Sequence, residues 1–304
     1  MRGRASVAAL SASVPRRVGW AVLVLLLAGC GSARVNPSAL PTADLPYAGA
    51  IVAYGVGETL VGLGVSTDGR LFVLSESGVQ LVRGFDWGLG GELSALLTGE
   101  TMGSGLLAPA DFDPTNGQDV LIADGSRVLR FSDEGQRVQT LDVPAVDRLE
   151  PTPGSTRSPG EAVAVAAGTD GRVFVADASR GVVQVWRDGA LVDVLDGLGR
   201  PVSLAADGRR VAVADAEQDV IRVLDSDGRP LATLEHEALA GLRSVSFAGD
   251  RILALGTEAV VVFEGGAVRV IPVSNGAALL DVALAGDRLF GVTADAVVLL
   301  GLVE

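Results

Sequence analysis

The chain repeats short stretches in which apolar and polar residues alternate, separated by tight turns. Residues 161–195 and 202–234 show the pattern most clearly. Each has an alternating stretch, a turn with Asp-Gly-Arg, a second stretch ending Val-Ala-Asp, a third stretch, another Asp-Gly turn and a fourth stretch. Alternation with a period of two, interrupted by Asp-Gly, is typical of antiparallel hairpins. Each segment is therefore predicted to form a meander of four strands.

The same unit recurs along the chain with weaker similarity. Copies begin near residues 60, 109, 161, 202, 243 and 279, and their first turns fall at Gly69, Gly117, Gly171, Gly208, Gly249 and Gly286. Repeats of roughly 40 residues that each form a small sheet are typical of β-propellers. The sequence therefore predicts an all-β fold, a six-bladed β-propeller of four-stranded antiparallel blades.

The sixth copy offers a test of ring closure, because it ends at Glu304 after only three strands. Residues 48–55 form an apolar stretch ahead of the first copy and have no partner within it. Pairing this stretch with the last copy would cover two open sheet edges. We therefore expect an N-terminal strand to close the last blade.

The second strands carry the motif by which the repeats resemble a known family. The motif reads Ile122–Asp124 in the second copy, Val175–Asp177 in the third and Val213–Asp215 in the fourth. With a small-residue inner strand and an Asp-Gly turn, it resembles the blades of NHL-repeat propellers, a resemblance that implies the fold and a tendency to bind partners. Because the same aspartate recurs in successive copies, we expect it to fix its turn through backbone hydrogen bonds rather than to take part in catalysis.

The N-terminus has the form of an export signal. Basic residues precede an apolar run at residues 18–27, which is too short to cross a bilayer that needs roughly 20 residues. The sequence Leu27-Ala28-Gly29-Cys30 then resembles the lipobox of bacterial lipoproteins, which implies acylation of Cys30, the only cysteine. We predict a signal peptide (1–29), a flexible tether with lipidated Cys30 (30–46) and the propeller (47–304).

This organisation predicts a protein of the cell envelope, extracytoplasmic and held on the membrane by the lipid on Cys30. Gly31 after the cysteine resembles the pattern of lipoproteins sent to the outer membrane, where the cell has two membranes. Loss of residues 1–29 removes four arginines and no acid, so the formal charge changes from -13 to -17. A chain this acidic is not expected to bind nucleic acid.

Candidate binding residues lie where the inner strands begin, around one mouth of the central channel. They are Asp111, Glu161, Arg200, Arg243 and Asp281. Charges of mixed sign on consecutive blades can orient a polar ligand through charge-assisted hydrogen bonds. The alternative is that they are solvated loop residues that pair with one another and contribute little.

Composition favours a protein without catalytic activity. The single histidine, His236, is expected in an exposed connection, and there is no histidine cluster for a transition metal and no phosphate-binding loop. We therefore predict a binding or assembly module for a protein, peptide or saccharide at the channel mouth, without cofactor. The alternative is a calcium-dependent hydrolase of the lactonase type, which the architecture resembles. That resemblance implies metal-ligand roles for Glu161 and Asp281, with Asn275 as the one available asparagine.

Overall fold

The computed structural model describes residues 51–53, 59–86, 90–97, 105–114, 119–132, 134–146, 159–273 and 279–302. The predicted signal peptide, Cys30, the tether and Asn275 lie outside these residues. Within the described part of the chain, no helix is long and apolar enough to cross a membrane.

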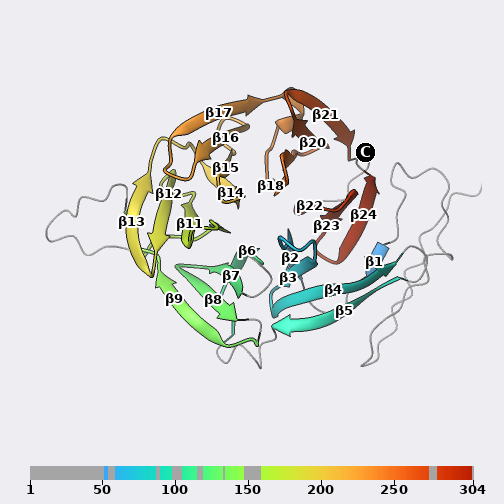
Figure 1. Ribbon diagram of the computed structural model, residues 1–304, viewed down its shortest axis with the longest axis horizontal. Coiled ribbons are helices and arrows are strands. Elements are labelled where there is room, and N and C mark those ends of the chain that lie inside the picture. The colour runs from blue at the N-terminus through green and yellow to red at the C-terminus, as the bar shows by residue number, and fades with distance from the viewer. Residues whose placement is uncertain are drawn as a thin grey trace, which may run out of the picture. The chain divides into compact units, whose positions relative to one another are not determined.

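The described strands form six antiparallel sheets of four strands each. Figure 1 shows the sheets following one another in a ring, with the first strand of each nearest the centre and the last at the rim. Consecutive inner strands lie against one another around the central channel. The predicted fold class, an all-β six-bladed propeller, is confirmed.

The strands keep one order in every blade. The inner strands are β2 (Leu60–Val65), β6 (Pro109–Asp113), β10 (Ala164–Ala167), β14 (Pro201–Ala206), β18 (Ser244–Ala248) and β22 (Asp281–Ala285). The second strands are β3 (Leu71–Ser75), β7 (Asp119–Asp124), β11 (Arg172–Asp177), β15 (Arg210–Asp215), β19 (Arg251–Leu255) and β23 (Arg288–Val292). The third strands are β4 (Gly78–Asp86), β8 (Arg127–Ser132), β12 (Val182–Arg187), β16 (Val220–Asp225), β20 (Ala259–Glu264) and β24 (Ala296–Leu302). The outer strands are β5 (Gly90–Leu97), β9 (Arg137–Asp142), β13 (Ala190–Leu195), β17 (Pro230–Glu235), β21 (Ala267–Pro272) and β1 (Ile51–Ala53).

The ring is closed by the N-terminal strand β1. It pairs antiparallel with β24, with Ile51 opposite Val298 and Ala53 opposite Ala296. The sixth blade therefore consists of three strands from the C-terminal end and one from the N-terminal end, and β1 lies beside β24 in Figure 1. The predicted closure of the last blade is confirmed.

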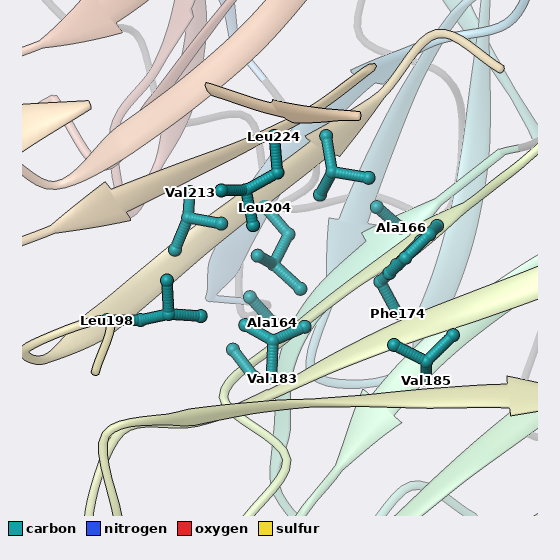
Figure 2. Close-up of a cluster of buried hydrophobic side chains, with 11 residues drawn as sticks. Ala164, Ala166, Phe174, Val183, Val185, Leu198, Leu204, Val213 and Leu224 are labelled. Atoms are coloured by element: carbon teal, nitrogen blue, oxygen red, sulfur yellow. The ribbon is translucent and has the colours of Figure 1, made fainter. Parts of the chain in front are cut away.

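Apolar faces of neighbouring blades pack against each other between the sheets. Between the third and fourth blades, Phe174 and Val183 of one sheet meet Leu204 and Val213 of the next, and all four are buried (Figure 2). Burying a side chain of this size stabilises the fold by roughly 1.5–3 kcal/mol. Because similar clusters lie between other blades, each blade depends on its neighbours for its core.

The turns between first and second strands gather at one end of the channel, which we call the turn face. Gly171 (φ 81°) and Gly208 (φ 85°) adopt the left-handed conformation that such turns require and that glycine adopts without strain. A Cβ at Gly208 would also collide with the side chain of Thr169 on the preceding blade. The turns of neighbouring blades therefore approach closely at the turn face.

Candidate functional site

Each repeated aspartate anchors the connection that enters its blade. The carboxylates of Asp124, Asp177 and Asp215 are 0% exposed, and we call them the anchor aspartates. The Oδ1 atom of Asp124 accepts hydrogen bonds from the backbone N–H groups of Leu107 (2.7 Å) and Ala108 (2.6 Å). These contacts reach back to the connection before β6, beyond the local turn that the sequence predicted.

Every anchor aspartate also has an arginine partner. The Nη2 atom of Arg127 lies 2.6 Å from Oδ2 of Asp124, and Arg180 and Arg222 make the corresponding ion pairs with Asp177 and Asp215. Burial alone would raise the pKa of Asp215, but the backbone N–H of Arg200, the Arg222 side chain and a second backbone N–H outweigh it and lower the pKa. Each of these buried carboxylates therefore has an arginine and backbone N–H donors around it.

Of the five candidate binding residues, the structure brings two together in the channel. Glu161, Arg200 and Arg243 are exposed at the mouth. The Arg200 side chain lies 3.4 Å from the carbonyl oxygen of Ala216, and that of Arg243 donates to the carbonyl of Leu279 at 3.0 Å. Asp111 and Asp281 are half-buried and interact electrostatically, so we call them the acid pair.

The acid pair belongs to one layer of the channel, set by the pairing of inner with second strands. Asp111 pairs with Ala123 and Asp281 with Val292, the residues at the same place in their second strands. The full layer is Gly62, Asp111, Ala164, Ser203, Ser244 and Asp281. The alignment on first turns instead places Pro109 level with Asp281. The register runs without a break from the turn to Asp111, and the β-bulge between Pro109 and Asp111 comes after it, so strand pairing and not the alignment on turns places Asp111 in this layer.

Asp281 is held by backbone hydrogen bonds from two blades. Its Oδ2 accepts a hydrogen bond from the backbone N–H of Leu63 on the first blade (2.9 Å), and its Oδ1 accepts one from Val282 (2.7 Å). The Ser244 hydroxyl lies near enough to favour the ionised carboxyl, although it lacks the geometry of a full hydrogen bond. Burial nevertheless dominates and raises the pKa of Asp281.

Of the acid pair, Asp111 has the pKa that is raised further. Its Oδ2 accepts from the backbone N–H of Val165 on the third blade at 3.0 Å. Burial is the main cause that raises its pKa well above the usual range, and the negative charges of Asp281 and Asp113 raise it further. A Cβ at Gly62 would lie 3.7 Å from Oδ2 of Asp281, so the glycine between the two blades leaves the carboxyl open.

A serine in the same layer shows what the structure alone requires at this position. The Oγ atom of Ser203 accepts from the backbone N–H of Val245 on the fifth blade at 3.1 Å. Asp281 and Asp111 make the equivalent bond to the first and third blades. A neutral hydroxyl therefore meets the structural need, and two carboxyls with raised pKa values exceed it.

A cavity of about 550 Å³ opens at the turn face, and we call it the turn-face cavity. Its wall includes residues of all six blades, among them Thr67, Asp113, Thr169, Phe247 and Arg251. Asp113 lies two residues beyond Asp111 on β6, and its Oδ2 accepts from the backbone N–H of Ala167 at 2.7 Å. The cavity lies at the end of the channel opposite to the predicted mouth. The acid pair lies one layer deeper in the channel than the cavity wall.

Histidine and metal chemistry have little support in the described part of the chain. His236 caps the short 3-10 helix η2 (Glu237–Leu239), where its Nδ1 accepts from the backbone N–H of Ala238 at 3.1 Å. No group of three or more His, Cys, Asp or Glu side chains among the described residues is arranged to hold a metal ion. The acid pair by itself offers two carboxylates, so the predicted calcium site stays a prediction.

The comparisons with known proteins give structural matches only. No family model and no curated protein matches the chain. A catalytically inactive histidine-to-alanine variant of virginiamycin B lyase from Staphylococcus aureus, with quinupristin, matches with a TM-score of 0.59 at 9% identity over 83% of this chain and 98% of that one. A streptogramin B lyase matches with 0.58 at 10% identity, over 84% and 97%. Selenomethionine-substituted virginiamycin B lyase from Staphylococcus aureus matches with 0.52 at 10% identity, over 88% and 98%.

These matches show that the chain shares the propeller fold of the lyases. They also contradict our prediction of a non-catalytic binding or assembly module, because the three solved structures named above are lyases. No family model supports the NHL resemblance, and the chain is a six-bladed propeller with structural neighbours of the virginiamycin B lyase type.

Proposed function

We propose that the protein is an enzyme that cleaves an ester-type bond by general acid–base catalysis at the acid pair. The observation that carries this proposal is the placement of Asp111 and Asp281, two carboxyls with raised pKa values, at channel positions where Ser203 meets the structural need with a neutral hydroxyl. Carboxyls whose environments separate their pKa values are the usual source of paired acid and base groups. The shared fold with lyases supports an enzyme.

The two carboxyls are suited to opposite roles. Asp111 keeps its proton to higher pH and is the general acid, which protonates the leaving oxygen. Asp281 receives hydrogen bonds on both carboxyl oxygens, ionises first, and is the general base. In hydrolysis the base takes its proton from water, and in elimination it takes it from a substrate carbon. After either reaction, Asp281 has gained a proton and Asp111 has lost one. Transfer of that proton from Asp281 to Asp111 restores the starting state of the pair.

The chain departs from its structural neighbour in one respect. The neighbour is inactive as a histidine-to-alanine variant, whereas the single histidine here, His236, holds the backbone of η2. The proposed chemistry therefore rests on carboxyls. Calcium is a candidate cofactor, since carboxylates are its preferred ligands. Asp111 and Asp281 would supply two of the six to eight oxygens that it takes.

The experiment is a cleavage assay with simple lactones, linear esters and quinupristin. Cleavage that falls by about 10²–10⁴-fold in both Asp111→Asn and Asp281→Asn is the expected result, because general acid–base groups contribute on that scale. Asp250→Asn, at a fully exposed carboxyl, is the control and should retain activity. Mass spectrometry separates hydrolysis, which adds a water, from elimination. Chelation with EDTA tests calcium. Failure to cleave any substrate, or activity retained by both acid-pair variants, would overturn the proposal.

We also propose that this enzyme works outside the cytoplasm, held on the membrane by lipid on Cys30. The lipobox-like residues 27–30 and the Pro- and Ser-containing tether at residues 31–46 support this. Cys30→Ser should move the protein from the membrane pellet to the soluble fraction after cell lysis. Continued sedimentation of that variant with membranes would contradict the anchor. The recurring Val-Ala-Asp motif supports NHL-type repeats as the origin of the blades.

A further inference from the structure

The turn-face cavity has the size of a ligand site. Its volume of about 550 Å³ lies within the range of roughly 300–1,000 Å³ for small-molecule pockets. It combines the phenyl ring of Phe247 with the hydroxyls of Thr67 and Thr169 and with charged side chains. It also leads toward the acid pair, so a molecule bound in it would lie on the way to the proposed catalytic groups.

Two of the charged groups in the wall are already neutralised by neighbours. Asp207 is paired with Arg210, whose Nε and Nη2 atoms lie 2.8 and 2.6 Å from its Oδ2. Arg251 donates through Nε to Glu264 at 2.9 Å. Each pair is close to neutral as a unit. The sign of the cavity is therefore determined by the side chains that the inner strands contribute.

The charged side chains on the described inner strands are all acidic. The layer next to the acid pair, toward the turn face, is Gly64, Asp113, Ala166, Ala205, Ser246 and Ala283. Together the two layers hold three carboxyls, those of Asp111, Asp113 and Asp281, and no arginine. The charge of Asp113 is near enough to Asp111 to raise its pKa. A positive charge in the cavity would be attracted by the negative charges of Asp113 and Asp281, while Asp111 keeps its proton.

A buried hydroxyl in the same layers adds a second polar feature. Ser244 is 4% exposed, and its Oγ has no hydrogen-bond partner among the described residues. It lies beside Asp281 in the layer of the acid pair. Buried hydroxyls normally have partners, so an unsatisfied one in a ligand channel favours a polar ligand group that reaches it.

We propose that the turn-face cavity binds a small organic cation, a primary ammonium or guanidinium compound with an apolar part. The charged group lies against Asp113, and the apolar part lies against Phe247. This inference deepens the proposed function, on which it rests for catalysis, by assigning a cationic substrate class. The binding site itself depends only on the cavity and its charges.

The test uses three probes of similar shape and different charge: 2-phenylethylamine, 2-phenylethanol and phenylacetate. Binding to the full chain in uncharged detergent is followed by calorimetry or by ligand-observed NMR. The amine should bind at least about tenfold more tightly than the alcohol, because it gains a partly buried charge pair, and phenylacetate should bind most weakly. Added salt should weaken binding of the amine alone.

Asp113→Asn removes the charge but keeps an oxygen that can accept from Ala167, so the fold should be retained. This variant should lose the preference for the amine. Asp250→Asn is the matched control, because Asp250 lies on the same face and is fully exposed. It should leave the preference unchanged. Equal binding of amine and alcohol, or an unchanged preference in Asp113→Asn, would overturn the inference.

The results also separate this inference from the proposed function. If the amine binds and no ester is cleaved, the cation site stands and the catalytic proposal fails. If esters are cleaved through the acid pair and the amine shows no preference, the catalytic proposal stands and the cation site fails. Enzymatic cleavage that prefers cationic substrates in the wild type, and loses that preference in Asp113→Asn, would support both.

Discussion

The anchor aspartates and the acid pair are carboxyls on neighbouring strands of the same blades, yet they have opposite electrostatic surroundings. Asp124 ends β7 and is surrounded by an arginine and two backbone N–H groups. Asp111 pairs with Ala123, the residue before Asp124, and faces the negative charge of Asp281. Among the groups with a resolved shift, the pKa of the anchor Asp215 is lowered and those of Asp111 and Asp281 are raised.

The difference separates what the ring requires from what it does not. The anchor aspartates recur at one position, and each ties an entering connection to its blade, which is a requirement that every blade shares. The acid pair stands on two blades only, and Ser203 meets the same structural need on a third. A side chain that recurs at one position of the repeat thus indicates a structural role, and a side chain that departs from the repeat indicates a functional site.

The largest effect should follow from removing an anchor. Asp124→Ala leaves Arg127 and the N–H groups of Leu107 and Ala108 without their acceptor, and should lower the free energy of unfolding by about 3–5 kcal/mol. Urea denaturation measures it. Asp250→Ala, at a fully exposed carboxyl, should change stability by no more than about 0.5 kcal/mol. A loss for Asp124→Ala as small as that of this control would remove the distinction.

A smaller loss should follow from removing an anchor's arginine. In Arg222→Met, Asp215 keeps two backbone donors, those of Arg200 and Glu217, so about 2 kcal/mol of stability should be lost. Arg229→Met replaces an arginine that is mostly exposed and should have an effect near zero. Equal effects in the two variants would mean that the anchors need no counter-ion.

Acid should weaken the anchor at Asp215. The pKa of Asp215 is lower in the folded protein than in the unfolded chain, so its stabilisation is present above the unfolded value and is lost as pH falls through the folded value. In acid, the stability of Asp215→Asn should therefore fall less steeply with decreasing pH than that of the wild type. Thermal melts between about pH 3 and 6 measure this. Parallel curves for the two proteins would contradict it.

Rising pH should have the opposite effect at the acid pair, and a modest one. The pKa of Asp111 is raised on folding, so the folded protein holds more protons than the unfolded chain between the two pKa values, and stability declines as pH rises through that window. Asp111→Asn has no such proton to lose. Its stability relative to wild type should increase from acid to neutral pH, and a constant difference would count against a raised pKa.

Much of the fold could be predicted from the sequence because the repeat expresses it locally. Alternating stretches and Asp-Gly turns indicated the blades, and the partnerless apolar stretch that contains Ile51–Ala53 indicated the closing strand. The recurrence of Asp177 and Asp215 indicated a structural role, and the Arg222 partner and the reach back to the preceding connection appeared only in three dimensions.

The site was harder to predict, because it depends on register rather than on motif. Asp111 enters the layer of Asp281 through its pairing with Ala123, and the glycine of the first turn does not indicate that register. Asp113 and Arg251 of the turn-face cavity gave no signal in the sequence, since they converge only when the ring is closed. Alignment of inner strands by burial, rather than by turns, would have grouped Ser203 with the acid pair.

The protonation state of Asp111 tests the account most directly. Infrared difference spectra between the wild type and Asp111→Asn report the carbonyl stretch of a protonated carboxyl. As pH rises, the wild type should keep this band beyond the pH at which an ordinary aspartate ionises, and Asp111→Asn should lack it, because burial and the charge of Asp281 raise the pKa of Asp111. A wild-type band that disappears in the ordinary range of aspartate, or no band that Asp111→Asn removes, would contradict the account of the acid pair.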